Sequence, residues 1–345
     1  MKKEKVKLII RTVSFLICAV VLFSVISSVF ERKTVAGPWN YMSKLNEFYS
    51  LEENTLDYIG VGSSHMYCAI NPLEIWNRSG ISGFVLATPE QPLMATYHYI
   101  IEAFKTQSPK YVVVEGFMLS KGTEYDSAYL YDTIDPLKFS FNKIKMINNL
   151  VEYDQRPEYY FNILKYHTRW RELSLSEVKT TFQTNVDTYK GFVALDGDYR
   201  REDNSIPNYD NTAQTELSEF NLNILNKMNA LITQNNSQMV LMIAPYNAQA
   251  SEVREAIQAG KEWAEQNNVP VLDYALMAKE IGIDPQNDYY DPAHLDVSGA
   301  AKISSHFASF LIEQGVQKNT QIDSTKWGID YDIYIKKFED DLNYQ

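Results

Sequence analysis

The stretch Leu56-Asp57-Tyr58-Ile59-Gly60-Val61-Gly62-Ser63-Ser64-His65 is the part of this 345-residue chain that decides its fold. Its first seven residues form a short β-rich run that ends in a glycine, which is typical of a buried strand. The Gly-Ser-Ser that follows predicts a tight turn. A serine in such a turn, ahead of a helix, presents its hydroxyl at the edge of the sheet beside backbone N–H groups.

Strands and helices alternate on both sides of this stretch. Alternation of this kind predicts an α/β fold with a parallel sheet and helices on both faces, and places the binding crevice at the carboxyl ends of the strands. The further strands are expected at residues 84–87, 111–114, 239–244 and 269–272, and helices at 91–107, 212–236, 252–267 and 297–313.

Three segments lie outside this rhythm. Residues 31–53 read as a connector, and residues 315–345 as a helical tail to which we assign no chemistry. Residues 117–211 are rich in tyrosine and charge, contain helical patches but no expected strand, and interrupt the domain at 54–314. We interpret them as an insertion that covers the mouth of the crevice. Their tyrosines either stack against sugar rings or pack against the domain.

The amino terminus predicts a membrane anchor. The 19 residues from Thr12 to Phe30 carry no charge, and the apolar segment 8–30 is long enough to cross a lipid bilayer. Five basic residues precede the run and almost balanced charges follow it, so residues 1–30 are expected to be a cytoplasmic tip and a transmembrane helix, with the domain outside the cell. The run is longer than a typical signal peptide, so we expect the anchor to be retained rather than cleaved.

Charge and cysteine content exclude two classes of function. The chain has a formal charge of −12, and residues 1–30 carry +4, so the remainder carries −16. Such an excess of negative charge repels phosphate backbones and argues against nucleic-acid binding. The only two cysteines, Cys18 and Cys68, lie far apart and rule out both a disulfide framework and a thiolate metal cluster.

A second polar cluster precedes the last expected helix, in Asp288-Tyr289-Tyr290-Asp291-Pro292-Ala293-His294-Leu295-Asp296. The spacing of Asp291 and His294 allows the carboxylate to accept the Nδ1 proton and fix the tautomer of the imidazole. His294 can then take a proton from Ser64. The alternatives are an ordinary Asp-Pro turn, a helix cap at Asp296 and a core histidine.

The two clusters together resemble the SGNH (GDSL-like) hydrolase superfamily over residues 54–314, with Gly62-Ser63-Ser64 at its Gly-Asp-Ser block and Asp291-x-x-His294 at its Asp-x-x-His block. The anchor, the insertion and the Gly-Ser-Ser variant are similar to its membrane-anchored extracytoplasmic branch, which includes DltD and the alginate-type O-acetyltransferases. The resemblance implies a three-layer α/β/α flavodoxin-like domain. It also implies that Ser64 is the nucleophile, His294 the general base and Asp291 the carboxylate that orients the base.

The blocks that usually complete the oxyanion hole are not intact. A glycine after the second strand and an asparagine after the third are replaced by Ala87-Thr88-Pro89-Glu90-Gln91 and Glu115-Gly116-Phe117. The residues considered for oxyanion or substrate binding are Gln91, Asn247 and His65. Each has a plain alternative: a first-turn residue for Gln91, a turn or cap residue for Asn247 and a structural role for His65. No cofactor and no metal is expected.

The expected function is that of a serine-dependent O-acyltransferase or esterase that acts through an acyl-Ser64 intermediate. The resemblance implies a cell-envelope glycan or a teichoic-acid-like polymer as acceptor, and a membrane-bound O-acyltransferase as a source of the acyl group. The alternative is a non-catalytic accessory or carbohydrate-binding protein of envelope assembly that has kept the fold. The incomplete oxyanion hole favours this alternative, and the intact Ser64, Asp291 and His294 favour the enzyme.

Overall fold

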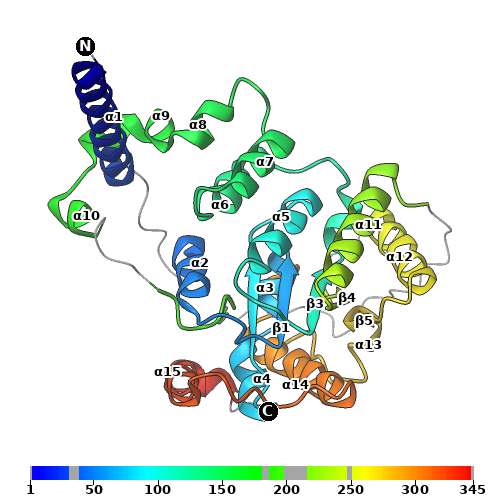
Figure 1. Ribbon diagram of the computed structural model, residues 1–345. Helices are drawn as coiled ribbons and strands as arrows, with labels where there is room; N and C mark the ends of the chain where they lie inside the picture. The colour runs from blue at the N-terminus through cyan, green and yellow to red at the C-terminus, as the bar shows by residue number, and fades with distance from the viewer. Residues whose placement is uncertain (1, 31–38, 181–185, 198–215, 247–250, 343–345) are drawn as a thin grey trace. The chain divides into compact units, whose positions relative to one another are not determined.

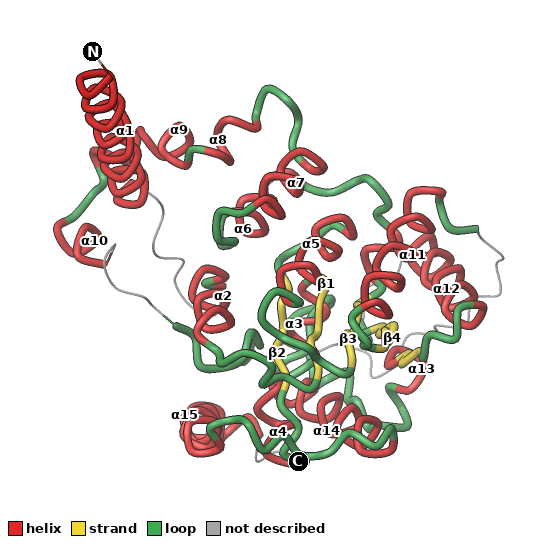
Figure 2. Tube along the Cα trace, viewed as in Figure 1, coloured by secondary structure: helices red, strands yellow, loops and turns green. Residues whose placement is uncertain are grey.

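The computed structural model describes residues 2–30, 39–180, 186–197, 216–246 and 251–342. The chain divides into two compact units. Unit 1 comprises residues 1–37 and 151–185, and unit 2 comprises residues 38–150 and 186–345. Figure 1 labels the helices and strands, and Figure 2 shows that the strands all belong to unit 2, where helices surround them.

Unit 2 is built on a five-stranded parallel sheet with the strand order β2-β1-β3-β4-β5. In its register Ile59 pairs with Phe84 on one side and with Val112 on the other. The predicted α/β class with a parallel sheet is therefore confirmed. The strands are β1 (Tyr58–Gly62), β2 (Gly83–Ala87), β3 (Tyr111–Glu115), β4 (Gln238–Ile243) and β5 (Val271–Asp273).

The strands are continuous apolar runs because helices pack against them. Every residue of β1, β2 and β3 is buried, as expected for parallel strands covered on both faces. One set of strand residues, including Val85, Val113 and Met242, shares a core cluster with α3 (Ser64–Ala69), α4 (Pro72–Ser79) and α14 (Val297–Glu313). The helices α5 (Leu93–Ala103), α11 (Glu219–Gln234) and α12 (Ser251–Gln266) also contact the sheet.

Caps fix where the helices at the sheet begin. Ser63 is the N-cap of α3 and accepts a hydrogen bond from the His65 N–H. Asn71 caps α4 in the same way, with Pro72 in the first turn, where its missing N–H costs nothing. The cap at Ser63 begins α3 directly after β1, so the chain turns sharply there, and Ser64 lies in this turn.

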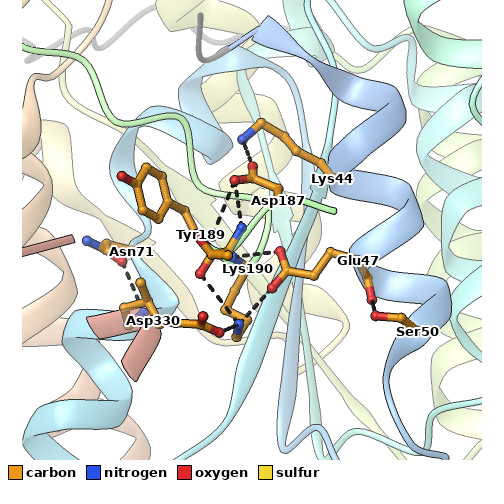
Figure 3. A network of polar contacts seen from close by, with 10 residues as sticks. Lys44, Glu47, Ser50, Asn71, Asp187, Tyr189, Lys190 and Asp330 are labelled. Atoms are coloured by element: carbon orange, nitrogen blue, oxygen red, sulfur yellow. Dashed lines mark hydrogen bonds and ion pairs between the residues drawn. The ribbon is translucent and has the colours of Figure 1, made fainter. Parts of the chain in front are cut away.

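The stretch 31–53, expected to be a connector, contains a helix, α2 (Tyr41–Ser50). Its buried Glu47 binds the ammonium group of Lys190 at 2.6 Å, and Lys190 also pairs with Asp330. Lys44 of the same helix pairs with Asp187. Figure 3 shows these ion pairs converging from α2, from the segment around Lys190 and from the C-terminal helix. A buried charge network therefore fastens α2 and the tail to the body of unit 2.

The remaining elements of unit 2 are short, apart from the last helix. The described parts of the predicted insertion, residues 117–180 and 186–197, contain helices and no strand, as expected. Its predicted role as a cover for the crevice stays a prediction. The elements of unit 2 not yet given are η2 (Phe117–Ser120), η3 (Ser127–Tyr129), α6 (Leu130–Ile134), α7 (Phe141–Leu150), α13 (Tyr274–Met277) and α15 (Ser324–Leu342).

Unit 1 contains the N-terminal helix α1 (Lys2–Phe30), which is long and apolar enough to cross a membrane. None of its most apolar window is buried against the protein, which distinguishes it from a core helix. The other elements of unit 1 are α8 (Arg156–Tyr160), α9 (Asn162–Tyr166), η4 (His167–Arg171) and α10 (Leu175–Thr180).

Candidate active site

Ser64 lies at the point where the order of the strands reverses direction. The chain passes from β1 to its neighbour β2 on one side, and then returns to β3 on the other side of β1. Parallel sheets bind ligands in the crevice outside the carboxyl ends of the strands at such a switch point. Ser64 follows β1 directly and is the first residue of α3. Its position is therefore one where chemistry is expected.

Gly62 makes the turn before Ser64 possible. Its φ of +151° is unfavourable for residues with a side chain, and a Cβ atom at this position would lie 2.5 Å from Cβ of Glu115. The close approach of β1 to β3 thus requires glycine here. The glycine of the predicted Gly-Ser-Ser turn is explained by packing at the end of the sheet.

The structure brings Ser64, His294 and Asp291 together in one hydrogen-bonded chain. Nε2 of His294 lies 2.8 Å from Oγ of Ser64, and Nδ1 lies 2.9 Å and 3.0 Å from the two carboxylate oxygens of Asp291. A carboxylate at Nδ1 holds the proton on that nitrogen and leaves Nε2 as an acceptor for the serine proton. The arrangement has the geometry of a nucleophile, a base and an orienting acid.

The loop of Asp291 and His294 is held by its own hydrogen bonds. Oδ1 of Asp291 accepts hydrogen bonds from the backbone N–H groups of Ala293 and His294 at 2.7 Å and 2.9 Å. Burial alone would raise the pKa of Asp291, but the hydrogen bonds from His294 and Ala293 outweigh it and lower that pKa. Asp291 is therefore a carboxylate at neutral pH. Its charge is available to stabilise a protonated His294.

The two neighbouring acids have other partners, so the contacts single out Asp291. Asp296 is the N-cap of α14 and accepts from the N–H groups of Ser298 and Gly299. Asp288 is fully buried and binds the ammonium group of Lys302 at 2.7 Å and the hydroxyl of Ser298 at 3.0 Å. Both acids fasten the loop to α14. The ring of His294 is hydrogen-bonded to Asp291.

His65 forms an aromatic wall beside this triad. Its ring stacks on Tyr246 at 5.1 Å and meets the edge of Phe117 at 4.2 Å, and its centroid lies 5.8 Å from that of His294. Burial, with a smaller contribution from His294, lowers the pKa of His65 to about 3. His65 is thus neutral and does not oppose a positive charge on His294. These contacts agree with the structural role that the sequence left open.

The side chain of Gln91 makes hydrogen bonds within the protein. Its side chain is buried, donates to Oγ1 of Thr96 at 3.1 Å and accepts from Oγ1 of Thr88 at 3.1 Å. The amide that was considered for an oxyanion role thus makes two hydrogen bonds within the protein, and that role stays a prediction. Asn247 lies outside the described residues, and its role stays a prediction.

Glu115 is a site residue that the sequence did not reveal. It ends β3, is buried and accepts a hydrogen bond of 2.7 Å from the Ser63 hydroxyl, besides one from the Phe117 N–H. Burial raises its pKa to about 7, although the bonds from Ser63 and Phe117 offset part of that shift. Glu115 ties the turn of the serine to the neighbouring strand. Its place directly after the third expected strand is the only signal that the sequence offered.

Tyr67 is a second residue that sequence reasoning missed. It lies one turn beyond Ser64 on α3 and is buried. Its hydroxyl accepts a hydrogen bond from the Tyr41 hydroxyl at 3.2 Å and lies near the Ser64 side chain. Burial is the main reason why the pKa of Tyr67 is raised well above its usual value, so the hydroxyl keeps its proton. The three-residue spacing from Ser64 on a helix was the available signal.

Comparisons with known proteins identify no family for the chain. No protein-family model matches the chain, and no curated protein matches it. The geometry of the site therefore supports the proposed function by itself.

Proposed function

We propose that the protein is a membrane-anchored serine esterase or O-acyltransferase of the SGNH type that acts outside the cytoplasm. The observation that carries this proposal is the hydrogen-bonded chain from Asp291 through His294 to Ser64, built from residues 230 positions apart. Such an arrangement serves nucleophilic acyl transfer on many unrelated folds.

The fold supports the same assignment. The strand order β2-β1-β3-β4-β5 is the order of flavodoxin-like sheets. Contacts of α3 and α5 with β1, and of α11 and α12 with β4, are what a three-layer α/β/α arrangement requires. The nucleophile after β1 and the acid and base before α14 stand where the SGNH resemblance expects them.

The reaction follows from the three side chains. Oγ of Ser64 attacks the carbonyl carbon of an ester while Nε2 of His294 accepts the serine proton. Asp291 stabilises the resulting imidazolium. When the tetrahedral intermediate collapses, His294 returns the proton to the departing alcohol and an acyl-Ser64 ester remains. A second hydroxyl, from water or from an acceptor, then gives its proton to His294 and attacks the ester. His294 returns this proton to Oγ of Ser64 as the bond between the acyl group and Ser64 breaks.

The negative charge of the intermediate needs hydrogen-bond donors near Ser64. The backbone N–H of Ser64 is at the first position of α3, where a helix leaves its N–H groups without partners inside the helix. The Tyr67 hydroxyl, which keeps its proton and lies near the Ser64 side chain, is the second proposed donor to the oxyanion.

The anchor determines the proposed setting. With five basic residues at the start of α1, ahead of its uncharged run, the amino terminus lies in the cytoplasm and unit 2 lies outside. An active site tethered to the membrane is suited to an acyl donor delivered by a membrane-bound O-acyltransferase. The proposed acceptor is a hydroxyl of a cell-envelope glycan or a teichoic-acid-like polymer.

A non-catalytic envelope protein of the same fold is the second candidate. The observations that favour it are the internal engagement of the Gln91 amide and the presence of Glu115, rather than an asparagine, after β3. Both weaken the usual oxyanion hole. A protein of this kind would bind glycan without forming a covalent bond to Ser64.

A serine-directed fluorophosphonate probe distinguishes the two candidates. The full-length protein in detergent should become covalently labelled, and Ser64→Ala should not. Ser79→Ala is a suitable control, because Ser79 lies at the end of α4 and its hydroxyl donates to the Ile75 carbonyl. Absence of labelling in a folded wild-type protein would favour the non-catalytic candidate.

A further inference from the structure

A segment of unit 1, residues 161–175, runs along the last two turns of α1. We call it the interfacial segment; it contains α9, η4 and the first residue of α10. The ring of Phe161 meets the edge of Phe23 at 5.8 Å. Further along, Ile163 contacts Ser27 and Arg169 contacts Phe30. The interfacial segment and the end of α1, which are far apart in sequence, thus form one continuous surface.

These contacts satisfy backbone groups that both helices leave open. The N–H of Ile163, in the first turn of α9, donates to Oγ of Ser27 at 3.2 Å. The guanidinium of Arg169 donates to the carbonyl of Phe30 at 2.8 Å. That carbonyl is one of the last four of α1, which have no partner within the helix, and α1 has no basic residue in its own last turn. Polar backbone near a bilayer needs such internal partners.

The interfacial segment exposes large apolar side chains. The exposed fractions are 50% for Phe161, 47% for Leu164, 61% for Trp170 and 84% for Leu175. Apolar side chains that cluster at a surface in this way mark a site of contact with a protein or a membrane. Because α9 and η4 of this segment contact α1, whose own apolar residues are exposed, the bilayer that surrounds α1 can also contact these side chains.

Charge in the interfacial segment points to the same occupant. Lys165, Arg169 and Arg171 against Glu172 give it a charge of +2, within a chain that carries −16 outside residues 1–30. The cations of Lys165 and Arg171 lie 4.4 Å and 4.9 Å from the rings of Tyr166 and Trp170. Aromatic rings beside cations are typical of the headgroup level of a membrane, where the cations attract anionic lipids.

The order of residues matches the depth profile of a bilayer. Phe23 lies seven residues before Phe30, which is about 10 Å along a helix that rises 1.5 Å per residue. Phe161, against Phe23, is therefore level with acyl chains when Phe30 is at the interface. Arg169, which binds the Phe30 carbonyl, is then level with the headgroups. Phe161 thus lies deeper than the cation of Arg169, in the direction in which the bilayer passes from chains to headgroups.

We infer that the interfacial segment inserts into the leaflet that contains the carboxyl end of α1, as a second membrane contact with a preference for anionic lipids. The inference deepens the anchoring part of the proposed function and does not depend on the chemistry of Ser64. It assigns part of the tyrosine-rich insertion to the membrane surface.

Depth-dependent fluorescence quenching in vesicles tests this inference on the full-length protein. An environment-sensitive thiol label is attached at Leu164→Cys in a Cys18→Ser background, since Cys68 is buried and does not react readily. The vesicles contain phosphatidylcholine and phosphatidylglycerol, with nitroxide groups at different depths of the lipid. We expect quenching by nitroxides in the lipid and protection from iodide in the water. A label that iodide quenches and lipid nitroxides do not would overturn the inference.

Two matched sites make the outcome unambiguous. Leu222→Cys on α11 is similarly exposed, at 41%, and should respond to iodide alone. The native Cys18 of α1 should respond to lipid nitroxides, because it reports on the anchor itself. If Cys18 stays unquenched by lipid, the proposed anchoring fails. If Cys18 is quenched and the label at Leu164→Cys is not, the inference alone fails.

The lipid preference has its own comparison. Lys165→Gln with Arg171→Gln leaves the Arg169 cap in place and should lower the ratio of inserted to free segment about fivefold for each cation removed, in anionic vesicles only. In pure phosphatidylcholine the double variant should match wild type. An equal loss in both lipids, or no loss in either, would contradict the preference for anionic headgroups.

Discussion

The carboxyl group of Glu115 lies 2.7 Å from the hydroxyl of Ser63, the residue before the proposed nucleophile. The bond joins the end of β3 to the turn after β1. A buried acid therefore supports the backbone that positions Ser64. Its protonation state couples the integrity of the site to pH.

This coupling predicts a fall in stability as pH rises. The pKa of Glu115 is raised from 4.5 to about 7 by burial, so between these values the folded protein holds a proton that the unfolded chain releases. Stability is greatest below pH 4.5, as far as this group is concerned, and is lost as pH rises through 7, by on the order of 3 kcal/mol. Urea unfolding of the detergent-solubilised protein from pH 5 to 8 measures the slope.

Glu115→Gln isolates the contribution of this residue. Glu47 has a similar shift, to about 7, caused first by burial, so the wild-type slope contains both acids. The Gln variant should lose about half of the slope and keep the rest. A slope identical to that of wild type would show that Glu115 is ionised in the folded protein throughout this range.

The acids near His294 should differ in the kind of defect that they produce. Asp291→Asn keeps an oxygen that accepts from the N–H groups of Ala293 and His294, but it loses the negative charge and no longer fixes the tautomer of the His294 imidazole. Acylation should therefore fall on the order of 10⁴-fold with little loss of stability. Asp288→Asn weakens buried bonds to Lys302 and Ser298, which should cost about 1–3 kcal/mol of stability while the folded fraction reacts normally. Acylation rates and urea unfolding of both variants give the comparison, and a larger rate defect in Asp288→Asn would identify it as the functional acid.

The hydroxyl of Tyr67 should matter to the rate and little to the fold. Tyr67→Phe removes the proposed second donor to the oxyanion and should slow acylation on the order of 10²-fold. Tyr41→Phe, whose hydroxyl contacts only Tyr67 among these residues, should have a smaller effect. Pre-steady-state acylation kinetics measure both. Equal rates for Tyr67→Phe and wild type would remove Tyr67 from the mechanism.

The buried network around Lys190 predicts a large loss of stability. Lys190→Met leaves the carboxylates of Glu47 and Asp330 without their cation and should cost about 3–5 kcal/mol above pH 7. The loss should shrink at lower pH, since the pKa of Glu47, raised by burial, is already about 7. Urea unfolding at pH 6 and 8 shows this difference. Adding Glu47→Gln should restore part of the stability, and a double variant as unstable as Lys190→Met would contradict the network account.

Much of the fold could be predicted because parallel strands are continuous apolar runs. The strand expected at 84–87 differs from β2 by one residue at its start, and the strand expected at 239–244 differs from β4 by one residue at each end. Helix ends were predicted unevenly: the helix expected at 297–313 has the same bounds as α14, whereas the helix expected at 91–107 is α5, Leu93–Ala103. The helix α2 was missed because it is short and its buried face carries Lys44 and Glu47, whose burial depends on partners far away in sequence.

The residues of the candidate site also fall into those that could be predicted from the sequence and those that could not. Ser64, Asp291 and His294 could be predicted because each follows or precedes a recognisable element at a fixed spacing. Glu115 and Tyr67 could not, because their contacts arise from the approach of β1 to β3 and from side-chain directions on α3. The direction of the Gln91 amide, toward Thr96, is likewise set by packing.

The central claim is that Ser64 forms an acyl-enzyme, and peptide mass spectrometry tests it most directly. The full-length protein is mixed with an activated acetyl ester, quenched in acid within its first turnover and digested with protease. We predict one added acetyl group on the peptide that contains Ser64, no adduct in Ser64→Ala, and little adduct in His294→Ala. A folded wild-type protein with no acetyl adduct, or with the adduct on another residue and unchanged in Ser64→Ala, would contradict the account.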